Sequence, residues 1–211
     1  MIKNGELFAM PLPGVGFVSA HVVFSLEHVE QLGLVPQVSL LRRYGSLLVD
    51  VYGPATVEPS SDANEMLIHG IWIDDRSIAG RDRPRWQRIG KRDVDPTSVE
   101  FSELVLNDTH NSVFVRGEIK KPLPYKSREV DRIDACTPFI AAGTVAMICM
   151  NLLGRGDLLG EQRILFELDG RFDLRYNANR DAVYREMGVE PTRGYFEWAT
   201  AEGLDPGRFW R

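Results

Sequence analysis

The feature of this sequence that most constrains its fold is a change of pattern near Leu123. Upstream of it, short runs rich in β-branched and aromatic residues are separated by glycines and prolines, which is typical of strands joined by turns. Downstream, a long apolar run and two capped segments indicate helices. Strands followed by helices predict an α+β protein. We expect an N-terminal antiparallel β-sheet or partly open β-barrel over residues 5–120, with helices in the C-terminal third packed on it.

A boundary between the two regions is expected at Pro122-Leu123-Pro124. Residues 1–125 would form the β-rich region, and residues 126–211 a helical region packed on it as one compact unit. A chain of 211 residues is long enough for one large domain, or for one domain with a substantial extension.

Five segments of the N-terminal region have the pattern of strands. They span residues 7–12, 17–24, 46–51, 66–73 and 113–120. The turn between the first two is Pro13-Gly14-Val15-Gly16, because proline restricts φ and glycine allows a positive φ. Since strand faces alternate, either Trp72 or its neighbours Ile71 and Ile73 should point inward. The polar stretch from Asp74 to Pro96 is expected to be a loop.

The longest helix is expected at Phe139–Leu153, because Thr137 is a suitable N-cap and Pro138 suits the first helical turn. Its β-branched residues leave a buried strand open as the alternative. Shorter helices are expected at Asn179–Met187 and Thr192–Glu202, each followed by a glycine. Four residues of the long segment are expected in the core: Phe139, Ile140, Met147 and Ile148.

Composition limits the class of protein. The formal net charge of -5 and the sequence pI of about 5.5 provide no general attraction to nucleic acid or anionic membranes. The two cysteines, Cys136 and Cys149, are too few for a disulfide framework and are expected to be buried. The apolar run Pro138–Leu153 is shorter than the roughly 20 residues of a membrane span. With no signal peptide after Met1, the expected location is the cytoplasm.

No motif of the sequence predicts catalysis, cofactor binding or metal binding. Gly14-x-Gly16 lacks the third glycine of a dinucleotide-binding fingerprint and precedes a strand instead of a helix. The four histidines lie at no metal-ligand spacing from one another or from a cysteine. Asp74 and Asp75 are adjacent in a polar segment, without the apolar shielding that separates the pKa values of an acid–base pair. An enzyme with a Cys–His site assembled from distant residues stays open as an alternative.

A basic segment stands out against the acidic net charge. Residues Arg76 to Arg92 contain seven bases, one acid and Trp86. Bases around an aromatic side chain can bind phosphates and stack on nucleotides, so a nucleic-acid-binding module using residues 76–92 is one hypothesis. The other is a solvated loop whose arginines pair with neighbouring aspartates and whose Trp86 ring pins it to the sheet. We favour the second, because flanking acids cancel the field that phosphate binding needs.

Two segments resemble one known family. Gly5-Glu6-Leu7-Phe8-Ala9-Met10-Pro11-Leu12, followed by a glycine turn and Gly16-Phe17-Val18, is similar to the opening of the immunity protein 26 family. Pro84-Arg85-Trp86-Gln87-Arg88-Ile89-Gly90 resembles that family's Trp-basic-x-Ile-Gly element, in the same order along the chain. Glu6 stands where that pattern more often has Asp. The resemblance covers about residues 4–125. It implies a mostly β, non-enzymatic cytoplasmic antidote to a bacterial polymorphic toxin.

The expected function is therefore that of an immunity protein, which binds one cognate toxin protein and neutralises it by stoichiometric inhibition. Neither a cofactor nor a membrane partner is expected, and a homodimer stays open. Arginine and aromatic residues dominate binding hot spots, so the contact is placed on the basic segment. The expected partner-binding residues are Asp74, Asp75, Arg76, Arg81, Arg83, Arg85 and Trp86. The aromatic residues between Tyr195 and Trp210 are expected either to dock on the chain's own core or to supply a second contact patch.

Overall fold

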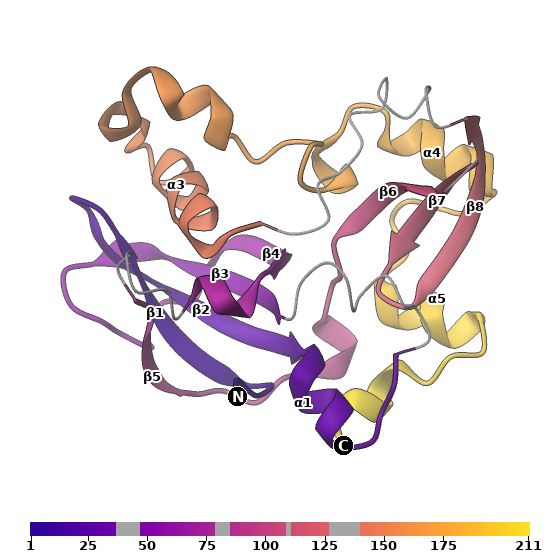
Figure 1. Cartoon of the computed structure of the whole chain (residues 1–211), viewed down its shortest axis with the longest axis horizontal. Coiled ribbons are helices and arrows are strands. Elements are labelled where there is room, and N and C mark those ends of the chain that lie inside the picture. The colour runs from indigo at the N-terminus through magenta and orange to yellow at the C-terminus, as the bar shows by residue number, and fades with distance from the viewer. Residues whose placement is uncertain (37–46, 79–84, 109–110, 127–139) are drawn as a thin grey trace.

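In a computed structural model, the chain forms two antiparallel sheets with helices packed around them (Figure 1). The structure describes residues 1–36, 47–78, 85–108, 111–126 and 140–211. The strands are β1 (Glu6–Leu12), β2 (Gly16–Ser25), β3 (Leu47–Thr56), β4 (Glu65–Ile73), β5 (Gln87–Lys91), β6 (Glu103–Asp108), β7 (Asn111–Arg116) and β8 (Ile119–Lys126). The α+β prediction is confirmed, and in the described residues the strands form two open sheets instead of a closed barrel.

The first sheet has five strands in the order β4-β3-β2-β1-β5. The predicted first hairpin is confirmed, with Leu12 paired to Gly16 across the turn. Glycine is required at position 16, because φ is +135° there and an added Cβ would lie 2.2 Å from the carbonyl oxygen of Thr56. The prediction of an irregular loop from Asp74 to Pro96 is wrong in one part, since β5 lies within it. That strand has exposed, charged side chains, so it lacks the apolar alternation that identifies a half-buried strand.

The second sheet has three strands in the order β6-β7-β8. The predicted single strand at residues 113–120 is instead a hairpin, in which Arg116 pairs with Ile119. Gly117 makes the turn with φ +57°, in a place where an added Cβ would lie 2.5 Å from the Tyr195 ring. The expected boundary at residues 122–124 lies inside β8. Both prolines are tolerated there because β8 is an edge strand, which needs backbone donors on one side only.

The three predicted helices are confirmed with later first residues, and helix α1 (Leu26–Gln31) was not predicted. The helices are α1, α3 (Ala142–Leu152), α4 (Arg180–Met187) and α5 (Tyr195–Ala201), with 3₁₀ segments η1 (Asp75–Ser77), η2 (Pro96–Ser98), η4 (Gly156–Phe166), η5 (Leu174–Tyr176) and η6 (Pro206–Trp210). Helix α4 ends at Gly188 in the left-handed conformation, as its sequence indicates. The predicted helix at 139–153 begins later, at Ala142, because Ile140 instead forms a bridge to Ile73 at the edge of β4. No described helix has both the length and the apolarity needed to cross a bilayer.

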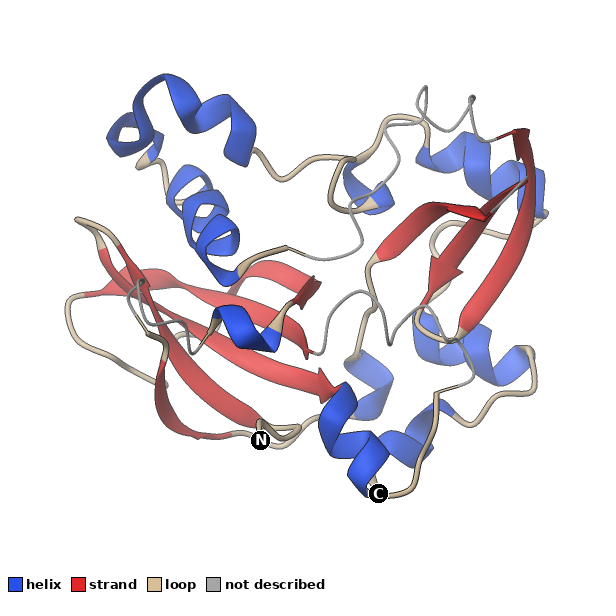
Figure 2. Ribbon diagram, in the orientation of Figure 1, coloured by secondary structure: helices blue, strands red, loops and turns tan. Residues whose placement is uncertain are grey.

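Both faces of the five-stranded sheet are covered, and this divides the core into two clusters. Helix α3 lies over one face, and the second sheet with its helices stands at one end of the first sheet (Figure 2), where Phe24, Leu48 and Trp72 pack into the cluster shared with it. Ile71 and Ile73 belong to the α3 cluster, and Trp72 belongs to the cluster shared with the second sheet. Only one of these two faces was expected to be buried, because the strand pattern is typical of a half-buried sheet. All three side chains are buried, because β4 is packed on both sides.

Two of the four core residues expected in the long apolar segment are confirmed. Ile140 and Ile148 are buried, and Met147 of α3 is half-buried against the same cluster. Phe139 lies outside the described residues, as does Cys136. Helix α3 therefore serves as the cover of the five-stranded sheet on the side of the β1–β2 hairpin.

Replacing Ile148 by alanine tests this packing. Ile148 has no exposed surface, so the Ile148→Ala variant should lose about 2–5 kcal/mol of unfolding free energy through lost burial and a residual cavity. Urea denaturation followed by tryptophan fluorescence would measure the loss. An unchanged midpoint would contradict the placement of α3 over the sheet.

Candidate partner-binding surface

The predicted binding segment begins with a well-anchored 3₁₀ turn. The Asp74 side chain caps η1 by accepting from the backbone N–H of Arg76, at 3.0 Å. It also forms an ion pair with the Arg76 guanidinium at 2.8 Å, although that side chain is 85% exposed. These interactions hold the pKa of the Asp74 carboxyl below its ordinary value, with the Arg76 side-chain hydrogen bond as the largest cause. The pairing of an arginine with a neighbouring aspartate is thus confirmed at this position.

The same turn is tied to helix α3. The Ser77 hydroxyl accepts a hydrogen bond from the backbone N–H of Ala142 at 2.8 Å and donates to the carbonyl oxygen of Asp74. Helix α3 has no side-chain cap of its own at Ala141, so Ser77 satisfies one of its free N–H groups from outside the helix. Segment 74–77 and the start of α3 therefore lie together.

Trp86 anchors the other end of the predicted segment. Its side chain is 8% exposed and packs on Phe8 of β1, with ring centroids 6.4 Å apart. This confirms the expectation that the ring is buried against the sheet. Arg85, next to it, is exposed. Arg81 and Arg83, which the sequence placed in the contact, lie outside the described residues.

These anchored groups border an open, mostly apolar hollow of about 360 Å³. It lies between the β1–β2 turn, η1, the indole of Trp86 and the first turns of α3. Its lining residues are Pro11, Pro13, Ser77, Trp86, Ala142, Gly143, Thr144, Ala146, Met147 and Phe166. A hollow with rigid proline and tryptophan walls suits an apolar side chain supplied from outside.

Exposed apolar residues continue this hollow over η4. Leu158, Ile164 and Leu165 are each close to half exposed or more, and Ile164 reaches 61%. Phe166 ends this segment in the hollow, while Leu158 lies close to Gly14 in the β1–β2 turn. We call Leu158, Ile164 and Leu165 the η4 apolar strip. No element was predicted here, although the sequence has a signal in three leucines and one isoleucine among glycines and charged residues.

Several bases of the segment from Arg76 to Arg92 are paired with other groups of the chain. Arg88 forms an ion pair with Glu6 of β1 at 3.0 Å, a partner outside the neighbouring aspartates that were expected. Arg92 lies over the Tyr52 ring and donates to the carbonyl oxygen of Ser61 at 3.1 Å. With Arg76 held by Asp74, three of its bases are engaged by the chain itself. This weakens the nucleic-acid hypothesis, because engaged cations have less to offer a phosphate backbone.

A second hollow of about 370 Å³, more polar than the first, lies at the other end of β5. Its lining comes from both ends of the chain, α1 and the segment after β5. The lining residues are Asn4, Gly5, His28, Leu32, Lys91, Arg92, Asp93, Val94, Phe209, Trp210 and Arg211. Strand β5 thus runs between an apolar hollow at Trp86 and a polar one at Lys91.

Three of the five C-terminal aromatic residues are buried, so they are not available for the second contact patch that was one of the two expectations. Tyr195, Trp198 and Phe209 are each 1% exposed. Trp210 donates its indole N–H to the carbonyl oxygen of Val23 at 2.7 Å. These rings fill the core between the two sheets, in agreement with the other expectation, that they dock on the chain's own core.

Cys149 and His21 are both buried in the core of the protein. Cys149 is fully buried in α3, and burial raises the pKa of its thiol, which keeps the group protonated and unreactive. His21 is buried in β2, with Nε2 3.1 Å from the carbonyl oxygen of Arg92, and burial lowers the pKa of its imidazole. His110 lies outside the described residues. In the part of the chain that the structure describes, no group of three or more His, Cys, Asp or Glu could hold a metal ion.

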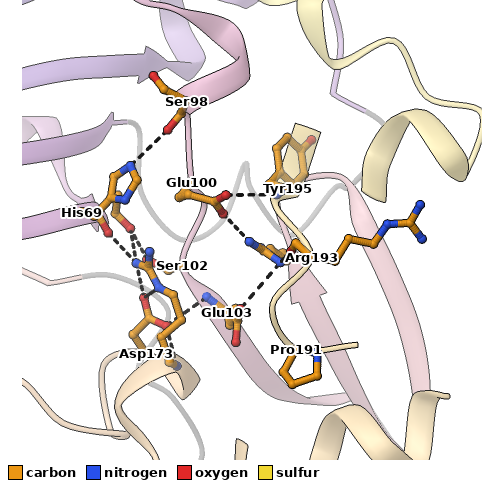
Figure 3. Close-up of polar contacts among 12 residues, drawn as sticks. His69, Ser98, Glu100, Ser102, Glu103, Asp173, Pro191, Arg193 and Tyr195 are labelled. Atoms are coloured by element: carbon orange, nitrogen blue, oxygen red, sulfur yellow. Dashed lines mark hydrogen bonds and ion pairs between the residues drawn. The ribbon is translucent and has the colours of Figure 1, made fainter. Parts of the chain in front are cut away.

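A cluster of buried charged side chains, which was not predicted from the sequence, lies at the junction of the two sheets (Figure 3). The Arg175 guanidinium donates to the backbone carbonyls of His69 and Gly70 in β4, at 2.5 and 3.0 Å. It pairs with Asp173 at 2.6 Å, and Asp173 in turn accepts from the backbone N–H of Glu103 in β6. Burial opposes the charge on Arg175, but the charge and hydrogen bond of Asp173, together with Tyr176 and Glu103, hold the pKa of the guanidinium above its ordinary value.

The cluster continues around Glu103, whose side chain has no exposed surface. Arg180 donates two hydrogen bonds of 2.7 Å to its carboxylate, and the Tyr184 hydroxyl donates another of 2.7 Å. Nearby, Arg116 pairs with Glu100 and donates to the carbonyl oxygen of Arg193 at 2.7 Å. These bonds fasten α4 and the segment before α5 to the second sheet. We therefore interpret the cluster as a structural joint between the two sheets.

No protein-family model, curated protein or solved structure matches this chain. Its binding properties are therefore inferred from its own surface, where the apolar hollow at Trp86 and the η4 apolar strip are the most distinctive features.

Trp86→Ala should destabilise the fold by about 3–5 kcal/mol, because the ring is buried on Phe8 and its loss leaves a cavity. Arg76→Ala should stay within about 0.5 kcal/mol, since that side chain is almost fully exposed. Thermal denaturation of the two variants would measure the difference. An unchanged melting temperature for Trp86→Ala would show that the ring has no structural role.

Glu103→Gln tests the buried cluster. The change removes the negative charge that faces Arg180 and Arg116, so it should cost about 3–5 kcal/mol by leaving cations without their buried counter-charge. Chemical denaturation would measure the loss. The matched control is Glu197→Gln, because Glu197 forms an exposed ion pair with Arg193 and should contribute about 1 kcal/mol or less. Equal losses for the two variants would contradict a structural role for the buried cluster.

Proposed function

We propose that this chain is an immunity protein, which neutralises one cognate bacterial toxin by binding it stoichiometrically. The observation that carries the proposal is the open apolar hollow floored by Trp86 and continued by the η4 apolar strip. Exposed apolar surface beside a rigid hollow is typical of a site for a protein partner. The toxin would insert an apolar side chain into the hollow.

The two segments that resemble the immunity protein 26 family are neighbours in space, which supports the proposal. Strands β1 and β5 pair directly, with Glu6 opposite Lys91 and Phe8 opposite Arg88. The tryptophan of the second segment packs on the phenylalanine of the first. Two short sequence elements about 75 positions apart thus form one structural unit, which borders the hollow.

The size of the surface also supports a protein partner. A specific protein interface buries about 800 Å² on each side, more than one loop provides. The hollow, the η4 apolar strip and the turn at Asp74–Ser77 together extend over several elements. Of the expected contact residues, Asp74, Asp75, Arg76, Arg85 and Trp86 are described, and Trp86 would serve as a rigid wall.

Co-expression with the product of the adjacent gene tests the proposal. We expect a 1:1 complex in size-exclusion chromatography and protection of the cells from that product. Titration of toxin activity should end at one immunity chain per toxin, because inhibition by binding involves no turnover. If a folded preparation forms no complex and gives no protection, the proposal is wrong, and salt-dependent retention on heparin would then favour the nucleic-acid alternative.

Two surface variants locate the interface. Leu165→Glu places a charge in the η4 apolar strip and should weaken the complex by about tenfold or more, because burying an unpaired charge is costly. Val35→Glu is the matched control, since Val35 is 56% exposed, close to the 53% of Leu165, and lies outside the hollow. Isothermal titration calorimetry would compare them. Equal affinities would exclude the strip from the interface.

A further inference from the structure

Strand β5 is an edge strand whose charge and position suit one kind of partner segment. It is the last strand of its sheet and pairs only with β1 among the described strands. None of its five residues is buried, whereas β1 is buried almost throughout. Alternate backbone groups of an edge strand point away from the sheet and can accept another strand.

The side chains along this edge carry one sign of charge. Residues Arg85 to Arg92 include four bases and no acid, in a chain whose net charge is -5. Arg88 and Arg92 are engaged by the chain itself, whereas Arg85 and Lys91 are exposed and have no carboxylate partner among the described residues. A second copy of this chain is a poor occupant, because two β5 strands side by side would oppose like charges. An acidic strand is a good one.

The two hollows lie at opposite ends of β5 and differ in polarity. The apolar hollow opens at Trp86, just before β5, and the polar hollow opens at Lys91, where β5 ends. Five strand residues span roughly 16 Å. An extended partner segment laid along β5 would therefore reach from one hollow to the other.

We propose that β5 binds an extended, acidic segment of the toxin as an added strand, with an apolar side chain of that segment in the Trp86 hollow and acidic side chains opposite Arg85 and Lys91. This inference rests on the proposed function and specifies how the partner is recognised. Main-chain hydrogen bonds would provide affinity, and the hollow and the cations would provide specificity. The bulge at Ile89, which has no partner in the β1–β5 register, would limit pairing with unrelated strands.

Hydrogen exchange of the full chain, alone and with the product of the adjacent gene, tests the backbone part. The outward-pointing amides within Gln87–Lys91 should exchange at least about tenfold more slowly in the complex, because an added strand satisfies those N–H groups. Unchanged exchange in a complex that forms would overturn strand addition.

Charge reversal tests the side-chain part. Arg85→Glu/Lys91→Glu should weaken binding at least about tenfold at about 50 mM salt, and the loss should shrink at about 500 mM, where surface charges are screened. The matched control is Arg185→Glu/Lys120→Glu, which makes the same charge change at exposed positions outside the β5 edge and its two hollows. Arg85→Lys/Lys91→Arg should bind like the unaltered chain. The two variants of the β5 edge should keep its melting temperature, because Arg85 and Lys91 are exposed and have no carboxylate partner among the described residues.

The outcomes separate the two proposals. Failure of the unaltered chain to bind the adjacent gene product overturns the immunity function and this inference with it. A complex that forms equally well with the charge-reversed edge and with its control overturns this inference alone. Selective loss on reversal of the edge, together with protection of β5, supports both.

Discussion

The arrangement of this protein depends on the buried charged cluster between its two sheets. Arg175 bonds to the backbone carbonyls of β4, and Asp173 beside it bonds to the backbone of β6, so a single Asp–Arg pair touches both sheets. The fit is close, since a Cβ on Gly70 would lie 1.7 Å from the carbonyl oxygen of Glu100. A buried ion pair adds little net stability, but removing either partner leaves an uncompensated charge. The cluster therefore selects one arrangement of the two sheets over others.

This joint also accounts for the uneven surface of the molecule. The C-terminal aromatic residues are drawn into the core beside the cluster, where Phe101 packs on Tyr195 with ring centroids 4.5 Å apart. The exposed apolar side chains beside the apolar hollow are those of η4, on the side of the five-stranded sheet that α3 covers. Helix α3 lies on the same side of the sheet as η4, where its buried face covers the strands and its first turns help form the hollow. Both faces of the sheet are therefore covered, and the hollow opens beside α3.

Local chemistry made much of the fold predictable. The β1–β2 hairpin follows from a proline and two glycines at its turn, and α4 follows from its terminal glycine. Strand β5 was not predictable in this way, because an edge strand with exposed arginines has no apolar alternation. The position of Trp86 was predicted as buried, since a tryptophan in a polar segment is usually an anchor. The other residues of the hollow were not predicted. Pro13, Met147 and Phe166 line it together only because α3 and η4 fold over the hairpin.

The sequence by itself determined the class of this protein, the order of its elements and the composition of its basic segment, since these depend on contacts between near neighbours in the chain. The tertiary structure decided which of those bases stay available. Arg88 is held by Glu6, more than 80 positions away, and Arg92 by Tyr52 and Ser61. Pairings across such separations depend on strand register and sheet order, which no local pattern encodes. For the same reason, the surface with which this protein would meet a partner emerges only when β1, β5, α3 and η4 are brought together.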